Sequence, residues 1–163
     1  MYFLNTRHII FGLCLLAAVP LSSIAVAAGG FTFNQIADTS TARPDGAGLF
    51  VINESGTVPA IDGSKVVFST RLGGNADSIW SFNTNGSGPL KLADLNTPVP
   101  GGVGTFTSLR IVGAPLVKGG SVVFSGTDST GLQSASSGIY TVPVLGGAIS
   151  RVANYNSPVP GGT

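Results

Sequence analysis

Apolar residues in this chain form one continuous run near the N-terminus and many short runs after it. The first run, residues 9–19, carries no charged side chain and is followed by Pro20 and two serines. Beyond residue 28 the apolar runs are short and rich in Val, Ile and Phe, and clusters of Gly, Pro, Asn and Asp separate them. Runs of this kind predict β-strands joined by turns, and no helical periodicity appears after residue 28.

The N-terminal run has the features of a cleavable signal peptide. Arg7 precedes the apolar stretch, and Ala25 and Ala27 place small residues at the two positions that a signal peptidase reads. The sequence therefore predicts a signal peptide at residues 1–28 and a secreted, periplasmic or cell-surface location. An uncleaved membrane anchor over residues 9–28 is the alternative, and Pro20 and the serines disfavour it.

The rest of the chain repeats itself with a period of nearly sixty residues. Ile36-Ala37-Asp38 recurs as Leu92-Ala93-Asp94 and again as Val152-Ala153-Asn154, at offsets of 56 and 60 residues. Residues 115–125 match residues 59–69 at the offset of 56. Self-similarity at a fixed long period is typical of proteins built from stacked repeats. We expect repeats over 29–163, with units at approximately 36–91 and 92–151 and a truncated third unit.

Each unit contains four strand signals. In the second unit they lie at residues 109–117, 122–125, 139–144 and 148–153. Runs such as Val66-Val67-Phe68 are apolar at successive positions, so such a strand needs cover on both faces. Stacked four-stranded blades provide that cover, and the sequence therefore predicts an all-β, β-propeller-like fold with about two blades.

The residues also resemble known families. Residues 65–69 followed by 78–92 resemble a TolB-type propeller blade, with an Asn-Gly-Ser-Gly hairpin before the final strand. The Ala-Asp-x-Asn-x-Pro-x-Pro-Gly-Gly segment is similar to uncharacterised secreted bacterial repeat proteins, some of which end in a PEP-CTERM-like tail. The resemblance covers nearly all of residues 31–163. It implies a propeller-like fold and export, and it says little about activity because propellers host many functions.

The sequence stops within a repeat motif. Pro160-Gly161-Gly162 matches Pro100-Gly101-Gly102, which continues into the next strand. A closed propeller has about four to eight blades, so we expect an incomplete propeller, a fragment whose further blades lie elsewhere in the same protein. Residues 30–37 read as a final strand without earlier strands, which would complete the last blade of a ring. Exposed apolar blade faces are expected in the chain as given.

The composition excludes several kinds of chemistry. His8 and Cys14 are the only histidine and cysteine, and both lie in the predicted leader. A Ser-His-Asp triad, a Cys-His pair and a His-based zinc site are thus impossible within residues 29–163. Apart from Arg7, seven basic residues balance seven acidic ones. A neutral chain without a basic stripe predicts no nucleic-acid partner and, after leader cleavage, no membrane partner.

Paired carboxylates are the remaining candidates for acid–base chemistry. The acidic residues are Asp38, Asp45, Glu54, Asp62, Asp77, Asp94 and Asp128. Asp38 and Asp94 hold equivalent repeat positions, with Asn154 at the third, which favours a structural Asx turn. Calcium binding by Asp94 and Asn96 is disfavoured because no dense Asp-rich loop or bidentate Glu lies nearby. We predict no catalytic residue, metal site or cofactor.

Two further repeated features have structural explanations. Gly-Gly pairs recur at 73–74, 101–102, 119–120, 146–147 and 161–162, and none precedes a helix as in a phosphate-binding loop, so we interpret them as turn glycines. Trp80 and Tyr140 share one repeat position. Aromatic residues at blade mouths can stack on sugars, but their place inside strands favours packing between blades.

These observations predict a non-catalytic, extracytoplasmic repeat scaffold that binds a protein or glycan partner through its loops. One alternative is a propeller enzyme, such as a glycan hydrolase or lyase, whose catalytic residues lie in blades outside this sequence. Another is a purely structural component of the cell surface.

Overall fold

The computed structural model describes residues 32–52, 58–72, 75–110, 116–128, 137–158 and 160–161. Asn34–Thr163 forms one compact unit. Its described part contains β-strands and no helix. The predicted leader, residues 1–28, lies outside the described residues. A search of the described part for a helix long and apolar enough to cross a membrane finds none.

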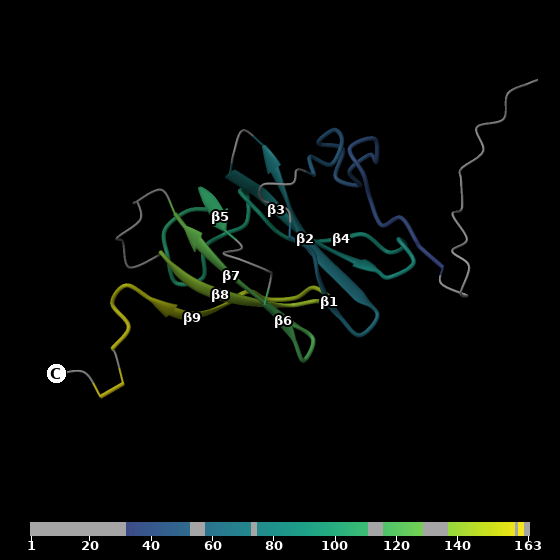
Figure 1. Ribbon diagram of the computed structural model, residues 1–163. Helices are drawn as coiled ribbons and strands as arrows, with labels where there is room; N and C mark the ends of the chain where they lie inside the picture. The colour runs from purple at the N-terminus through teal and green to yellow at the C-terminus, as the bar shows by residue number, and fades with distance from the viewer. Residues whose placement is uncertain are drawn as a thin grey trace, which may run out of the picture. The chain divides into compact units, whose positions relative to one another are not determined.

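The described residues contain nine strands in two antiparallel groups (Figure 1). The first sheet consists of β1 (Ala60–Asp62), β2 (Lys65–Leu72), β3 (Asn75–Asn83) and β4 (Leu90–Asp94). The second sheet consists of β5 (Ser108–Arg110), β6 (Leu116–Lys118), β7 (Ser121–Thr127), β8 (Gly138–Pro143) and β9 (Ser150–Asn154). The all-β prediction is confirmed for this part of the chain.

Each sheet pairs its strands in a simple order. In the first sheet β1, β2, β3 and β4 pair consecutively. In the second sheet β8 covers one edge of β7, and β5 and β6 pair with successive stretches of the other edge. The five strands of the second sheet therefore fill four positions. One backbone pair, Ala76 with Leu109, connects the two sheets.

The two sheets have the same pairing register. Phe68 pairs with Trp80 in the first sheet, and Phe124 pairs with Tyr140 in the second. An irregularity follows Ile79 where β3 pairs with β4, and it recurs after Ile139 where β8 pairs with β9. Because side chains alternate between the faces of a strand, equal register gives the two sheets equivalent faces.

We call one of these faces the aromatic face. In the first sheet it carries Val66, Phe68, Trp80 and Phe82, all buried. Phe50 approaches it edge-on, with its ring centroid 5.3 Å from that of Trp80 and 5.8 Å from that of Phe68. Edge-to-face contacts of this kind add about 0.5–1.5 kcal/mol per pair to the burial of the rings.

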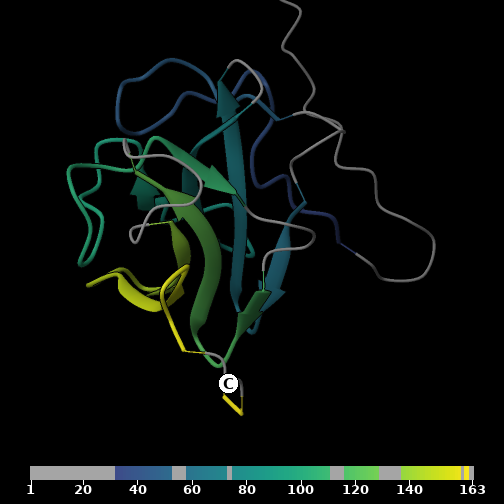
Figure 2. The same ribbon diagram turned by 90° about the vertical axis from the view of Figure 1, so that its left-hand side faces the viewer.

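The opposite, aliphatic face of the first sheet packs against the aromatic face of the second. Val67 and Ile79, from the first sheet, share one core with Phe106, Phe124 and Tyr140, from the second. Figure 2 shows the green strands of the second sheet lying against the teal strands of the first. Residues 66–68 are therefore buried on both faces of their strand, as their successive apolar positions predicted.

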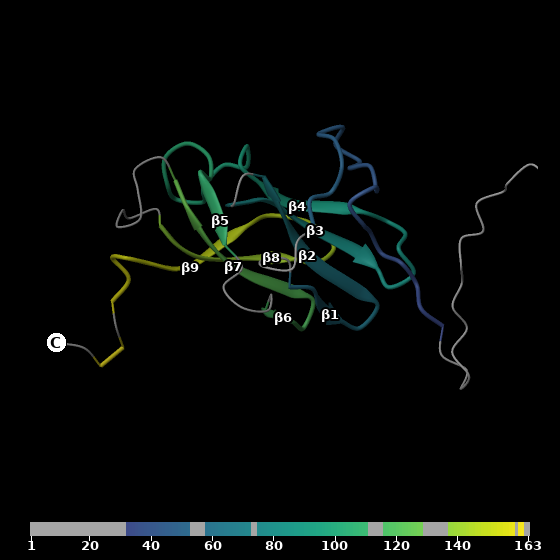
Figure 3. The same cartoon turned by 45° about the horizontal axis from the view of Figure 1, so that its top comes forward.

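A further contact joins the ends of the sheets. The turn between β1 and β2 meets the turn between β6 and β7, where the backbone N–H of Gly120 donates a hydrogen bond to Asp62 Oδ2 at 2.8 Å. β1 and β6 lie beside each other there (Figure 3). The two sheets are thus held together at their turns as well as through their shared core.

One expectation differs from the structure. The described residues of the predicted strand 30–37 form no strand, because no neighbouring strand supplies backbone partners, although Ile36 and Ala37 pack on the aromatic face of the first sheet. The described strands form an open arrangement and no closed ring. The propeller architecture therefore remains a proposal, and the demonstrated fold is two packed antiparallel sheets.

Candidate functional site

The recurring Asp and Asn residues form one kind of turn. Asp94 Oδ1 accepts hydrogen bonds from the Thr97 hydroxyl at 2.8 Å and from the backbone N–H of Asn96 at 3.0 Å. Asn154 Oδ1 makes the same two bonds with Ser157 and Asn156. The amide serves as well as the carboxylate, so the turn needs an acceptor oxygen and not a charge. The predicted structural role of these positions is confirmed.

The charge state of the turn aspartates fits that role. Hydrogen bonds from Thr41, and then from Ser40, lower the pKa of Asp38 to about 2. Burial acts to raise the pKa of Asp94, but hydrogen bonds from Lys91 and Thr97 outweigh it and lower the pKa. Both groups are therefore carboxylates at neutral pH, and neither holds a proton to donate.

A cation already faces Asp94. Lys91 Nζ lies 2.7 Å from Asp94 Oδ2 and 3.1 Å from Asp45 Oδ2. An ammonium group there occupies the space in which a calcium ion would have to meet these oxygens. Among the residues that the structure describes, no group of three or more His, Cys, Asp or Glu side chains is arranged to hold a metal ion.

Each Asp turn opens a small hairpin. We call residues 38–50 the first hairpin and residues 94–106 the second hairpin. In the first, Phe50 N–H donates to the carbonyl of Thr41 at 3.0 Å, and in the second Phe106 N–H donates to the carbonyl of Thr97 at 3.1 Å. A second backbone bond closes each tip, from Arg43 to Gly48 and from Val99 to Gly104. The hairpins are therefore ordered loops, and each ends on the phenylalanine that covers an aromatic face.

The first hairpin also carries a charge cluster, which we call the Arg43 cluster. The Arg43 guanidinium lies 2.5 Å from Asp77 Oδ2 and 2.9 Å from Asp45 Oδ2, and its side chain is only 7% exposed. Asp77 also accepts hydrogen bonds from the hydroxyls of Thr70 and Ser78. The guanidinium carbon stands 5.8 Å from the centre of the Trp80 ring, within the range of a cation–π contact.

The contacts of the Arg43 cluster shift the pKa values of its members. Burial acts to raise the pKa of Asp77, but hydrogen bonds from Thr70 and Arg43 outweigh it, so the pKa is lowered. Burial acts to lower the pKa of Arg43, and the bonds to Asp45 and Asp77 reverse the effect. The carboxylates are held ionised by a permanent cation, an arrangement that attaches the first hairpin to β3 and does not create a proton donor.

Sequence reasoning missed the Arg43 cluster. The first repeat reads Arg43-Pro44-Asp45 where the second reads Val99-Pro100-Gly101, and Ser137 takes the place of Asp77. The simultaneous appearance of an arginine and an aspartate where the other repeat has neither was the available signal.

Asp62 and Asp128 lie apart from this cluster. Asp62 accepts the Gly120 N–H, and Asp128 Oδ2 accepts the Val103 N–H at 3.3 Å. Glu54 lies outside the described residues. Asp45 is brought near two other carboxylates, Asp77 across Arg43 and Asp94 across Lys91, so a cation lies between the members of each pair. They do not form an open pair of carboxylates around a substrate cleft.

The aromatic and glycine positions have structural roles. Trp80 and Tyr140 are 1% and 0% exposed, so the packing interpretation is confirmed and neither ring can stack on a sugar. The Trp80 indole N–H donates to the Ser78 hydroxyl at 2.9 Å. Positive φ angles at Gly101, Gly119 and Gly146, for example, confirm that the described pair glycines serve turns.

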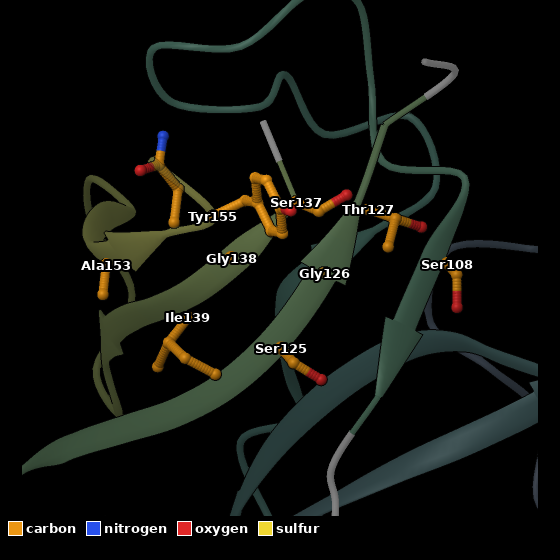
Figure 4. Close-up of a pocket in the computed structure, with 10 residues that line it drawn as sticks. Ser108, Ser125, Gly126, Thr127, Ser137, Gly138, Ile139, Ala153 and Tyr155 are labelled. Atoms are coloured by element: carbon orange, nitrogen blue, oxygen red, sulfur yellow. The ribbon is translucent and has the colours of Figure 1, made fainter. Parts of the chain in front are cut away.

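An open pocket lies on the aliphatic face of the second sheet. Ser125 on β7, Ile139 on β8 and Ala153 on β9 stand side by side across this surface, and Tyr155 lies at its edge (Figure 4). Ile139 is 41% exposed and Tyr155 is 68% exposed. This surface and the two hairpins are the candidate interaction sites of the described chain.

Comparisons of the chain with protein-family models, with curated proteins and with solved structures find no significant match.

Proposed function

We propose that this chain is a non-catalytic, extracytoplasmic repeat scaffold whose sheets stack as propeller-like blades and whose hairpins bind a protein or glycan partner. The observation that carries the proposal is the pair of hairpins. Their backbone bonds are the same, yet their tips differ, with Pro44-Asp45-Gly46-Ala47-Gly48 in one and Pro100-Gly101-Gly102-Val103-Gly104 in the other. Ordered loops with variable tips on a constant sheet framework are a common way to build binding surfaces.

The use of the charged residues supports a scaffold. Asp38 and Asp94 hold turns, and Asp45 and Asp77 neutralise Arg43. An acid–base pair instead requires two carboxyl groups in different protonation states, facing a cleft. The lowered pKa values of all four groups favour ion pairing and turn formation over proton transfer.

The test is a binding experiment with the exported chain. Purified protein is applied to an array of bacterial polysaccharide fragments and to separated cell-surface proteins, and the affinity of each ligand found is then measured. Two variants change the hairpins: Val103→Ser, at a side chain 66% exposed, and Leu49→Thr, at one 51% exposed. Leu145→Ser is the control, because Leu145 is 72% exposed and belongs to neither hairpin but to the β8–β9 turn.

We expect the hairpin variants to weaken binding about tenfold or more, as loss of a central, energetically dominant contact residue does, and the control to leave it unchanged. Binding that responds equally to all three variants would contradict recognition through the hairpins. Shortened or unsaturated glycan products, detected by mass spectrometry after incubation, would support an enzyme instead.

A further inference from the structure

The two aliphatic faces are built alike but only one is covered. Ile79 in the first sheet is 0% exposed, whereas its equivalent in the second sheet, Ile139, is 41% exposed. Leu92 is 7% exposed, and its equivalent Val152 is 62% exposed. Equivalent residues in equivalent register differ this much because the second sheet lacks the neighbour that the first sheet has.

The neighbour of the first sheet has a defined chemistry. It is an aromatic face, and it contributes Phe106, Phe124 and Tyr140 to the core that buries Val67 and Ile79. Phe106, the last residue of the second hairpin, reaches this core because the second hairpin leads the chain from β4 to the second sheet. The aliphatic face of the first sheet and the second hairpin are therefore linked. The face provides an apolar surface, and the hairpin places the Phe106 ring against it.

The same hairpin begins again after β9. Ser157 N–H donates to the carbonyl of Asn154 at 3.0 Å, as Thr97 N–H does to the carbonyl of Asp94 at 3.1 Å. The side-chain bonds of this turn are also repeated. The second sheet thus carries both the open face and the start of the connection that serves the covered face of the first sheet.

We propose that the aliphatic face of the second sheet, formed by Val123, Ser125, Ile139, Thr141 and Ala153, is the docking surface for a further β-sheet with an aromatic face. That sheet presents rings at the positions that Phe106, Phe124 and Tyr140 hold in the second sheet. This inference rests on the stacking part of the proposed function and identifies the surface and the partner through which stacking continues.

A second copy of the chain fits this surface poorly. Residues 34–38 lie over the aromatic face of the first sheet, where Gln35 O would be 2.7 Å from a Cβ at Gly86. Leu90 of β4 lies over the second sheet in the equivalent place, beside Gly146. Suppose that the open face of one copy bound the first sheet of a second copy. The β9 strand of the first copy would then need the space that residues 34–38 of the second copy already fill. The occupant is therefore a sheet whose aromatic face is free.

The experiment adds such a sheet and follows the accessibility of the open face. In a Cys14→Ser background, which removes the single cysteine, one chain carries Ile139→Cys alone. A second carries Ile139→Cys and, after Thr163, a duplicate of residues 104–163, which continues the repeat in register. The rate of thiol labelling by a maleimide is measured in both chains. Leu145→Cys serves as the exposed control and Ile79→Cys as the buried control.

We expect the duplicate to slow labelling of Ile139→Cys about a hundredfold or more, because a covered thiol reacts only when the structure opens locally. Leu145→Cys should label rapidly and Ile79→Cys slowly in both chains. Equal labelling of Ile139→Cys in the two chains overturns the proposal. An unfolded duplicate overturns it too, since the same residues fold on the first sheet.

A second copy would reveal itself in the shorter chain. Light scattering that shows a dimer, together with slow labelling of Ile139→Cys without the duplicate, would assign the face to another copy and overturn the proposal. The hairpin variants that test partner binding do not change this surface. Loss of stacking and loss of partner recognition are therefore measured separately.

Discussion

Replacing Arg43 by methionine tests whether the Arg43 cluster stabilises the first hairpin. Methionine keeps the unbranched apolar stem of the side chain and removes the guanidinium group, with its charge and hydrogen bonds. Asp77, with a side chain 13% exposed, then loses its guanidinium partner and keeps the hydroxyls of Thr70 and Ser78. Asp45 keeps Lys91. The variant therefore leaves one mostly buried carboxylate with incomplete compensation.

The expected loss of stability follows from that geometry. Removing one partner of a buried ion pair costs about 3–5 kcal/mol, because the remaining charge stays buried without compensation. The two remaining hydroxyl bonds reduce this cost, so we expect the Arg43→Met variant to lose about 2–4 kcal/mol at neutral pH. Changing Asp77 to serine in the same chain, the residue that the second repeat has at this position, removes the uncompensated charge and should recover more than half of the loss.

The loss should depend on pH. In the natural chain the pKa of Asp77 is lowered from 3.8, so its ion pair stabilises the fold above that pH and the contribution is lost as the pH falls through the lowered pKa. Without Arg43, fewer hydrogen bonds oppose the effect of burial, so the pKa of Asp77 in the folded variant rises. The carboxyl group then takes up a proton at a higher pH, and the difference between variant and natural chain shrinks as the pH falls from 7 toward 4.

Urea unfolding followed by the fluorescence of Trp80, the single tryptophan, measures both effects. Arg151→Met, at an exposed arginine bonded to the carbonyl of Gly101, is the matched control and should change stability by about 0.5 kcal/mol or less. A loss below about 1 kcal/mol, or a loss of the same size at pH 7 and pH 4, would refute the structural role assigned to the Arg43 cluster.

Three other predictions concern the sheets and turns. Phe124→Ala removes a ring that is 2% exposed in the shared core, and should cost about 3–5 kcal/mol in urea unfolding. Gly138→Ala should cost about 1–3 kcal/mol, because the new Cβ would lie 2.3 Å from the carbonyl oxygen of Ala153 and force β8 and β9 apart; a stable variant with unchanged amide chemical shifts in β9 would contradict this packing. Asp94→Ala should cost about 1 kcal/mol, and Asp94→Asn less than half as much, because Asn154 makes the same turn with an amide; equal losses would show that the charge is essential.

Much of the fold could be predicted from local patterns. Apolar residues at three successive positions, 66–68, correctly indicated a strand covered on both faces. The offsets of 56 and 60 residues placed Trp80 and Tyr140 at one position, and the two sheets do pair those residues in the same register. Turn chemistry is also local, so the role of Asp94 followed from its neighbours. These features depend on contacts between residues near in sequence or related by the repeat.

The remaining features depend on contacts that the repeat does not encode. A strand was predicted at residues 30–37, but a strand forms only beside a partner, and the described part of that segment has none. The pairing of Arg43 with Asp77 spans 34 residues. It joins a hairpin to the middle of the sheet, and only the three-dimensional arrangement shows that the two side chains meet.

The two repeats share one strand register but carry different side chains at the Arg43 cluster and at its equivalent in the second repeat. The second repeat has Gly126 where the first has Thr70, and a Cβ at Gly126 would lie 2.5 Å from the ring of Phe106. The absence of that side chain lets Phe106 approach Tyr140 to 5.0 Å, and Val99 fills the remaining space with an apolar contact. Val99 and Phe106 of the second hairpin lie in the core shared by both sheets, where a charge would be costly to bury. The aromatic face behind the first hairpin is covered by residues 34–38 instead of a complete sheet, so its ion pair keeps a small exposure to water, and this lowers the cost of burying Arg43 and Asp77. If that reasoning is correct, transferring Arg43 and Asp77 together to the second repeat, as Val99→Arg with Ser137→Asp, should destabilise the chain although both partners are present.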